Sequence, residues 1–239
     1  MKYILGVCIL SVLISCRQDR NGGMKEGIVQ DSLIKKDTLP GPAAGIAETA
    51  LASLESLADT TFVRLADFSS EFAYDLRYAT TNNFLKAQVY DCPECYTRVK
   101  TARALIDANN DFIQQGYRIK FFDCYRPNSV QYRMWEIVPN PQYVANPVKG
   151  SIHNKGGAVD ITLETLGGTE VDMGTDFDYF GKRAYHDNTD LPAAILENRR
   201  TLRETMERYG FWSIRTEWWH YNLGAASNEE IADFRWPCE

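Results

Sequence analysis

Residues 151–163 read SIHNKGGAVDITL, and this stretch predicts a loop followed by a strand. Its glycine pair is typical of a turn. The residues after the pair alternate between apolar and polar side chains, which predicts a strand with Asp160 and Thr162 on one face. We therefore expect a loop carrying His153 that folds back onto a strand carrying Asp160.

A second segment, Glu217-Trp218-Trp219-His220, contains another of the chain's 3 histidines. In a plain strand Glu217 and His220 would point to opposite faces, so we expect a bend at the tryptophan pair. A pair of imidazoles and one carboxylate can occupy three positions of a tetrahedral zinc ion and leave the fourth for water, whose pKa the ion lowers to about 7. A carboxylate such as Glu217 can then take the water proton. The predicted ligands of one zinc ion per chain are His153, Asp160 and His220.

Each histidine also has an interpretation without metal. A single histidine beside apolar residues is more often a core or surface residue than a ligand, and His153 or His220 alone would be read that way. Their joint occurrence beside carboxylates favours the metal site. The remaining histidine, His186, lies in Tyr185-His186-Asp187-Asn188, a segment typical of a solvated loop.

Composition limits the class of protein. A hydrophobic fraction of 44%, with 13 Tyr, 11 Phe and 5 Trp among 239 residues, is sufficient for one globular core. The formal charge is -6, and the sequence has no cluster of lysine and arginine that would attract nucleic acid or an anionic membrane surface. Composition therefore argues against nucleic-acid binding.

Apolar spacing predicts three helices. From Thr97 to Gln115 apolar residues recur every three or four positions, which predicts a helix that ends at Gly116. A second helix is expected to begin at a cap formed by Asn128 or Ser129 and to run through Trp135. The third is expected over 191–209, with Asp190 as its cap and Gly210 after its end.

Short apolar and alternating stretches between these helices predict strands. They lie at 62–63, 72–74, 117–122, 158–163, 211–214 and 216–222. Helices and strands are mixed along the chain, and we find no internal repeat. We therefore expect an α+β fold, with a small and mainly antiparallel sheet flanked by helices in a single domain.

The first residues predict an export signal. Lys2 precedes an apolar run from Tyr3 to Ile14 that is too short to span a bilayer as a helix. The run ends in Leu13-Ile14-Ser15-Cys16, which is similar to the bacterial lipobox, where cleavage occurs before a cysteine that becomes lipid-modified. We expect a lipoprotein signal at 1–15 and a lipid anchor at Cys16; the alternative is an ordinary signal peptide.

The predicted anchor places the mature protein in the bacterial cell envelope, facing the periplasm. Arg17 is not the aspartate that signals inner-membrane retention, so the outer membrane is favoured. Residues 16–58 are rich in small and polar residues and are read as a flexible spacer, with a hint of a short helix at Leu51, Leu54 and Leu57. The folded domain is expected over 59–239.

Beyond the signal and Cys16, an even number of cysteines remains for an oxidising compartment: Cys92, Cys95, Cys124 and Cys238. They allow one or two disulfides in three complete pairings, and Cys92 and Cys95 are near enough in sequence to pair with each other. A zinc or thiol redox site at Cys92-Pro93-Glu94-Cys95 is the competing interpretation. A bridge from Cys124 would brace the segment that carries Tyr125 and Arg126.

Taken together, these segments resemble the D-alanyl-D-alanine dipeptidases of the vancomycin-resistance type, within the zinc D-Ala-D-Ala peptidase group. The resemblance covers about Tyr74 to Tyr221 and implies a single zinc peptidase domain. It rests on the two histidine segments and on Asp75-Leu76-Arg77-Tyr78-Ala79-Thr80, Asn83-Phe84, Tyr125-Arg126-Pro127 and Met173-Gly174-Thr175-Asp176-Phe177-Asp178.

The resemblance also implies roles for individual residues. His153, Asp160 and His220 would be zinc ligands, and Glu217 the general base and acid. Arg126 matches the arginine that steadies the oxyanion, a role suited to its permanent planar charge. The residues implied to hold the substrate are Ser151, Asp178 and Tyr78, with Asp178 opposite the ammonium of a free dipeptide. The implied activity is hydrolysis of D-Ala-D-Ala to two D-alanines.

Other functions stay open at this stage. A D,D- or L,D-carboxypeptidase of the same zinc group would trim peptidoglycan stem peptides, a non-catalytic module would use zinc only for stability, and a thiol oxidoreductase would use Cys92 and Cys95. The lipobox, spacer and cysteine pair are departures from the cytoplasmic resistance enzymes. They favour salvage of wall-derived dipeptides over protection of a cytosolic precursor pool.

Overall fold

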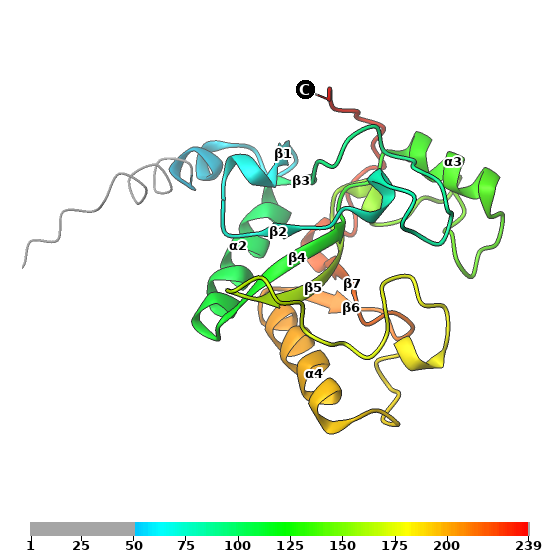
Figure 1. Cartoon of the computed structure of the whole chain (residues 1–239). Helices are drawn as coiled ribbons and strands as arrows, with labels where there is room; N and C mark the ends of the chain where they lie inside the picture. Colours follow the sequence, from blue (N-terminus) through cyan, green and yellow to red (C-terminus); the bar gives the residue numbers. More distant parts are fainter. Residues whose placement is uncertain (1–50, 239) are drawn as a thin grey trace, which may run out of the picture. The chain divides into compact units, whose positions relative to one another are not determined.

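The computed structural model describes residues 51–238, and a five-stranded sheet in the order β2-β4-β5-β7-β6 lies at the centre of this part of the chain (Figure 1). Strand β2 pairs parallel with β4, and every other pairing in the sheet is antiparallel. The expected α+β fold with a small, mainly antiparallel sheet is confirmed. The strands are β2 (Ala73–Tyr74), β4 (Tyr117–Asp123), β5 (Ala158–Thr165), β6 (Phe211–Ser213) and β7 (His220–Leu223).

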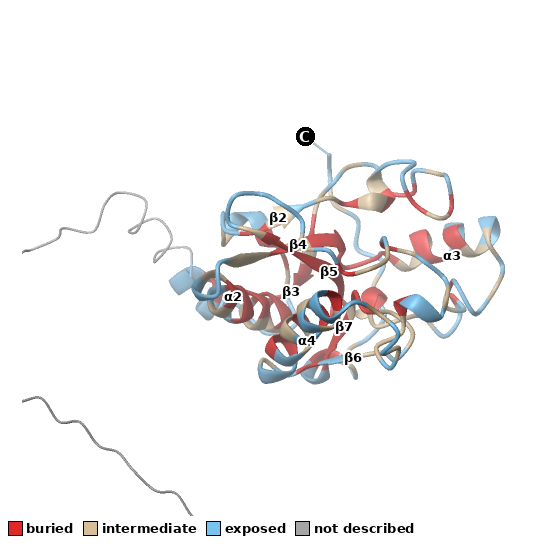
Figure 2. Cartoon of the chain, turned by 60° about the horizontal axis from the view of Figure 1, so that its bottom comes forward, coloured by how far each residue is buried: buried red, intermediate tan, exposed pale blue. Residues whose placement is uncertain are grey.

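A separate antiparallel pair joins β1 (Phe62–Arg64) to β3 (Tyr96–Arg98), directly before the first long helix. Helices α2 (Val99–Gln114) and α4 (Ala193–Arg208) contact each other and pack against β4 and β6, respectively. Figure 2 shows the central strands coloured as buried and the outward sides of these helices as exposed. Helix α3 (Asn128–Ile137) lies apart from both of them in Figures 1 and 2.

Apolar side chains of the sheet and of the two long helices form the core. Ile119 and Phe121 of β4 lie opposite Leu163 and Ile161 of β5, and all of these side chains are buried. They join the buried apolar residues of α2 and α4 in one cluster. Because side chains alternate along a strand, the opposite face of β5 is left to Asp160 and Thr162, as the sequence predicted.

A bulge in β4 changes which side chains reach that opposite face. Phe121 is paired with Ile161, but Asp123 is paired with Asp160, so β4 has one residue more than β5 between the two pairs. Simple alternation would leave Asp123 on the core face with Phe121. The bulge instead brings Asp123 to the face of Asp160, as bulges beside functional sites often do.

The helix ends agree with the sequence only in part. Gly116 and Gly210 follow α2 and α4 with positive φ, as expected for glycines that end helices. The expected caps are wrong: α3 and α4 follow Pro127 and Pro192, and neither helix has a side-chain cap at that position. At the start of α3, the Ser129 amide donates instead to Asp233 of the C-terminal segment, which no local pattern predicts.

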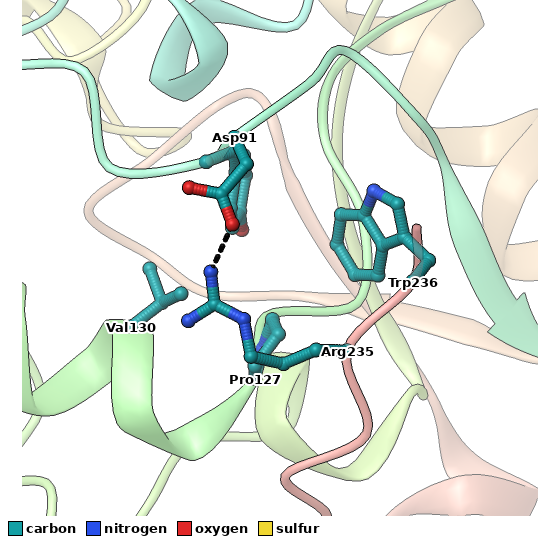
Figure 3. A pocket seen from close by; sticks show the side chains of 6 residues that line it. Asp91, Pro127, Val130, Arg235 and Trp236 are labelled. Carbon is teal, nitrogen blue, oxygen red and sulfur yellow. Dashed lines mark hydrogen bonds and ion pairs between the residues drawn. The ribbon is translucent and has the colours of Figure 1, made fainter. Parts of the chain in front are cut away.

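The structure resolves the cysteine pairing that the sequence left open. Cys92 is bonded to Cys238 and Cys95 to Cys124, so the neighbours Cys92 and Cys95 do not pair with each other. The first bridge fastens the C-terminal segment to the domain, and Figure 3 shows the ion pair between Arg235 and Asp91 beside it. Trp236 of the same segment stacks on Tyr96 and lies near the start of α3.

The first described residues also pack onto the domain. Residues 51–56 are helical, as the leucine spacing suggested, and Leu54 is buried. Arg103 of α2 donates hydrogen bonds to the carbonyl oxygens of Leu54 and Leu57. The predicted signal at 1–15, the predicted anchor at Cys16 and most of the predicted spacer lie outside the described residues. Between residues 51 and 238 we find no helix that is both long and apolar enough to pass through a membrane.

Candidate active site

A cavity of about 320 Å³ opens on the sheet face that carries Asp160 and His220. Strands β5 and β7, the segment after β4, and the loops at 138–152 and 178–180 all contribute to its walls. Every site residue predicted from the sequence in the folded domain, apart from the cysteines, lines this one cavity. These residues are Tyr78, Arg126, Ser151, His153, Asp160, Asp178, Glu217 and His220.

Strand register brings the three predicted metal ligands together. Asp160 of β5 and His220 of β7 are directly paired, and side chains of such a pair lie on the same face. His153 reaches the same point from a short 3-10 helix, His153–Lys155, that precedes β5. The His220 Nδ1 atom lies 3.0 Å from Asp160 Oδ1 and 3.2 Å from His153 Nε2, and the third distance, from His153 Nε2 to Asp160 Oδ1, is 3.4 Å.

This donor set fits a zinc ion. Metal-to-ligand distances of 2.0–2.1 Å in a tetrahedron correspond to ligand separations of about 3.3 Å. In each imidazole, the nitrogen that faces away from the other predicted ligands has a hydrogen-bond acceptor. His153 Nδ1 donates to Cys124 O at 2.7 Å, and His220 Nε2 donates to Asn222 Oδ1 at 2.9 Å. In neutral rings the other nitrogens, His153 Nε2 and His220 Nδ1, would present lone pairs to each other and to the carboxylate, and a zinc ion bound between them would balance these groups.

Electrostatics at Asp160 and His220 agrees with a cation site. Burial acts to raise the pKa of Asp160, but the charges and hydrogen bonds of the two histidines outweigh burial and hold the pKa below its ordinary value. Burial acts to lower the pKa of His220, but its hydrogen bond to Asp160 outweighs burial and raises the pKa. Positive charge is thus favoured at this point of the cavity.

The turn that carries His153 is held by backbone contacts. The Arg126 amide donates to His153 O, and Gly156 ends the 3-10 helix with a φ of 71°. A Cβ atom at Gly156 would lie 2.5 Å from the ring of Phe62, so this position requires glycine for space as well as for conformation. The bridge between Cys95 and Cys124 fixes the segment whose carbonyl accepts the His153 proton.

Glu217 lies beside the metal ligands. The expected bend is present at Trp218 and Trp219, where a turn precedes β7, and the indole nitrogen of Trp218 donates to Thr175. This bend places Glu217 Oε2 4.0 Å from His220 Nδ1, and the Glu217 side chain retains 27% exposure toward the cavity. Burial raises the pKa of Glu217 above its ordinary value, which suits a group that must both accept and release a proton.

Arg126 is buried and anchored. Its Nε and Nη2 atoms donate to Asp123 Oδ2, and Nη1 donates to Gln131 Oε1 at 2.9 Å. The guanidinium also lies over the ring of Tyr78, 5.2 Å from the ring centroid. Burial acts to lower the pKa of Arg126, but the charge of Asp123 outweighs it, so Arg126 keeps its positive charge in the cavity wall.

A second part of the cavity wall, the loop that carries Asp178, holds an acidic group. The Tyr78 hydroxyl lies between the two carboxylate oxygens of Asp178, at 3.2 and 3.1 Å, and shares its single proton with them. Burial and the charge of Asp160 raise the pKa of Asp178 well above its ordinary value. Asp178 also has a φ of 60°, a conformation that is uncommon outside glycine. The Ser151 hydroxyl is buried without a partner in the described part of the chain and lies in the cavity wall.

Sequence reasoning missed three polar residues around the site. Asp123 and Gln131 hold Arg126, and Asn222 holds His220. Asn222 had a detectable signal, since it lies two residues after His220 and therefore on the same face of a strand. Asp123 and Gln131 flank Arg126 closely in sequence, but the bulge and the helix that aim them toward it are not visible there.

The prediction for His186 is confirmed for the loop, since residues 185–188 form a turn, but the His186 side chain is only partly exposed. Its ring packs edge-on against Tyr221, and burial lowers its pKa to about 4. The Nε2 atom is buried without a hydrogen-bond partner among residues 51–238. His186 therefore lies in a surface turn, but its ring is a partly buried neutral imidazole that packs against Tyr221 of β7.

Comparison with known proteins gives consistent matches. A family model described as D-Ala-D-Ala dipeptidase matches residues 58–237. The D-alanyl-D-alanine dipeptidase of Escherichia coli (strain K12) is 31% identical over 183 residues, which cover 76% of this chain and 95% of that protein. The D-alanyl-D-alanine dipeptidase of Enterococcus faecalis is 32% identical, with coverage of 68% and 91%.

Solved structures are also similar to this chain. One of them is a vancomycin-resistance D,D-pentapeptidase in complex with Zn(II), with 18% sequence identity, a TM-score of 0.37, and coverage of 54% of this chain and 73% of that chain. The family match at 58–237 contains every residue that lines the cavity.

Proposed function

Because the chain belongs to the D-alanyl-D-alanine dipeptidase family of zinc metallopeptidases, we propose that it hydrolyses the free dipeptide D-Ala-D-Ala to two molecules of D-alanine. The observation that carries this proposal is the position of Asp178. Its carboxylate lines the same cavity as the three predicted metal ligands and has no ion-pair partner among the described residues, although the charge of Arg126 acts to lower its pKa. A free dipeptide supplies such a partner in its ammonium group.

The metal centre defines where the peptide bond must lie. His153, Asp160 and His220 would hold the zinc ion, which supplies Lewis acidity toward a peptide carbonyl and lowers the pKa of water. Glu217 accepts the proton of the attacking water and delivers it to the departing amine, because its carboxylate borders His220 and its pKa is raised. Arg126 stabilises the negative charge that develops on the carbonyl oxygen.

The length of the substrate would be selected at Asp178. The ammonium of D-Ala-D-Ala pairs with Asp178, whose orientation Tyr78 fixes through its hydroxyl. In a longer peptide the same nitrogen belongs to an amide and carries no charge. Binding would then leave the Asp178 carboxylate buried without a cation, a loss that discriminates strongly between substrates.

The test compares D-Ala-D-Ala with its N-acetylated form. We expect kcat/KM to be higher for the free dipeptide by about 10-fold or more, because a charged hydrogen bond contributes about 1.5–3 kcal/mol. Glu217→Ala is the matched control: it should retain zinc and lose about 100- to 10,000-fold in kcat. Preference for the acetylated dipeptide or for a pentapeptide would contradict the proposal and favour a carboxypeptidase. Full turnover by Glu217→Ala would remove the proposed role of that residue.

We also propose that the enzyme works in the cell envelope, anchored through a lipid at Cys16. Two disulfides within the domain support an oxidising compartment, since cytosolic proteins rarely keep structural disulfides. There the enzyme would recycle dipeptides released from the cell wall. Cys16→Ser should move the protein from the membrane fraction to the soluble periplasmic fraction. Recovery of the wild-type protein from the cytoplasm would contradict this location.

A further inference from the structure

Gln131 has no role in the reaction proposed above, but its side chain contacts the catalytic cavity wall. It lies in α3, is fully buried, and uses both ends of its amide. Its Oε1 atom accepts from Arg126 Nη1 at 2.9 Å, and its Nε2 atom donates to Ala145 O at 2.8 Å. Arg126 and Ala145 both line the catalytic cavity, so a single side chain joins two parts of the cavity wall.

The ion pair with Asp123 does not by itself fix the plane of the Arg126 guanidinium. Both contacts from Arg126, through Nε and Nη2, go to the same oxygen, Asp123 Oδ2. The other oxygen, Oδ1, accepts instead from the Tyr90 hydroxyl and the Cys124 amide. Two bonds that converge on one atom allow the guanidinium to rock about that atom. A contact at Nη1 prevents this motion, and Gln131 provides it.

We propose that Gln131 is a positioning residue that sets the orientation of Arg126 toward the developing oxyanion. Of the five N–H groups of a guanidinium, the contacts to Asp123 and Gln131 use three, which leaves at most two for substrate. Their direction decides whether they point at the carbonyl oxygen. Through Ala145, the same amide fixes that direction relative to the segment after α3, which forms another part of the cavity wall.

The catalytic consequence rests on the proposed dipeptidase function. Gln131→Met keeps a side chain of similar length and removes both hydrogen bonds. Because Arg126 acts on charge that exists only in the transition state, we expect kcat for D-Ala-D-Ala to fall about 10-fold or more while KM changes by less than about 2-fold. Zinc content should remain that of the wild type, because Gln131 does not contact the predicted ligands.

A double-mutant cycle distinguishes positioning from general structural support. Lysine cannot reproduce the planar fork of arginine, so Gln131→Met should change kcat by less than about 2-fold when it is introduced into Arg126→Lys. An equal fall in both backgrounds, or unchanged kcat for Gln131→Met alone, would overturn the inference. If Gln131→Met does not fold, Gln131→Glu enters the same cycle: it keeps the acceptor for Arg126 and should lose less kcat than Arg126→Lys.

A second readout needs no substrate and so remains valid if the proposed function fails. In the wild-type protein, hindered rotation should give the Arg126 guanidinium separate Nη proton signals by NMR, assigned through their loss in Arg126→Lys. We expect these signals to merge or broaden in Gln131→Met. Separate, sharp signals in that variant would show that Asp123 alone fixes the guanidinium. Absence of D-Ala-D-Ala hydrolysis by the wild type would instead count against the proposed function.

Discussion

Two parts of the cavity wall, here called the metal side and the Asp178 side, are built differently. On the metal side, Asp160 and His220 are adjacent on paired strands, and the outer nitrogen of each histidine has a hydrogen-bond acceptor. On the Asp178 side, Asp178 lies in a loop with a φ of 60°, and its pKa is well above the ordinary value. The metal side is therefore organised by strand pairing. On the Asp178 side, the charged form of the carboxylate is unfavourable unless a cation binds beside it.

This difference assigns separate energetic roles to the two sides. Strand register provides the ligand geometry at little conformational cost, so changes there should affect metal content and chemistry together. The Asp178 side reduces the stability of the free protein, and the ammonium of the substrate should restore part of that loss. Variants on each side can test the distinction, because their effects on zinc, turnover and thermal stability should differ.

The largest effect is expected on the metal side. Asp160→Asn removes the anionic ligand while keeping the side-chain shape, so we expect loss of zinc and a fall in activity of at least about 1,000-fold. Asp190→Asn, at an exposed carboxylate, is the matched control and should have no effect. Metal analysis and turnover are measured together. A fully active Asp160→Asn protein with normal zinc would show that the metal is held elsewhere.

Asp178→Asn tests the part of the cavity wall around Asp178. We expect kcat/KM for D-Ala-D-Ala to fall about 10- to 100-fold with zinc content unchanged, because the ammonium loses its charged partner. The same variant should be more thermally stable. Since the folded pKa of Asp178 is raised, the folded state binds its proton more tightly than the unfolded state does, and wild-type stability falls as pH rises through the folded pKa. Asparagine removes that fall.

The stability gain of Asp178→Asn should therefore increase with pH above the ordinary carboxyl range and vanish in acid. Thermal unfolding between pH 4 and 8 measures it. A variant that is less stable than the wild type at neutral pH would contradict the idea that this carboxylate is held at a cost.

A smaller effect is expected at Asn222, which orients the predicted metal ligand His220. Asn222 accepts the outer proton of His220, and loss of such a contact typically weakens metal affinity or activity about 10- to 100-fold. We expect Asn222→Ala to reach the lower end of that range in a zinc competition assay. Asn222→Asp keeps an acceptor and should retain affinity near that of the wild type. Equal affinities for all three proteins would mean that His220 is oriented without Asn222.

The smallest effect on activity is expected at His186, behind the sheet. Burial lowers its folded pKa from 6.5 to about 4, so the unfolded state binds the proton more tightly in this window. The free energy of unfolding that depends on neutral His186 should be at its full value above pH 6.5. It should fall by up to about 3 kcal/mol as pH decreases through 4. His186→Gln should lack this fall in urea unfolding and keep normal turnover at neutral pH. Identical pH profiles for the two proteins would contradict this assignment.

Sequence reasoning predicted the features that depend on local pattern. The helix at α2, the strand with Asp160, and the bend at Trp218 and Trp219 follow from periodicity, from turn residues and from the need to aim Glu217 and His220 at one point. The candidate site was recognisable because its chemistry requires a few residue types that are rare in this chain, above all histidine.

The features that were missed depend on contacts between distant segments. The bulge that aims Asp123 exists only when β4 is paired with β5, and the disulfide partner of Cys92 is 146 residues away. The amides at the start of α3 find their acceptors in the C-terminal segment, so capping residues near Asn128 were not needed. His186 lies in a polar sequence but is buried by Tyr221, a residue on another element.

The most direct test of this account is anomalous diffraction from crystals of the zinc-loaded protein, recorded at the zinc absorption edge. The account predicts a single strong peak about 2.0–2.2 Å from His153 Nε2, Asp160 Oδ1 and His220 Nδ1. A peak at any other group of side chains, or none at these three in a protein that cleaves D-Ala-D-Ala, would contradict it.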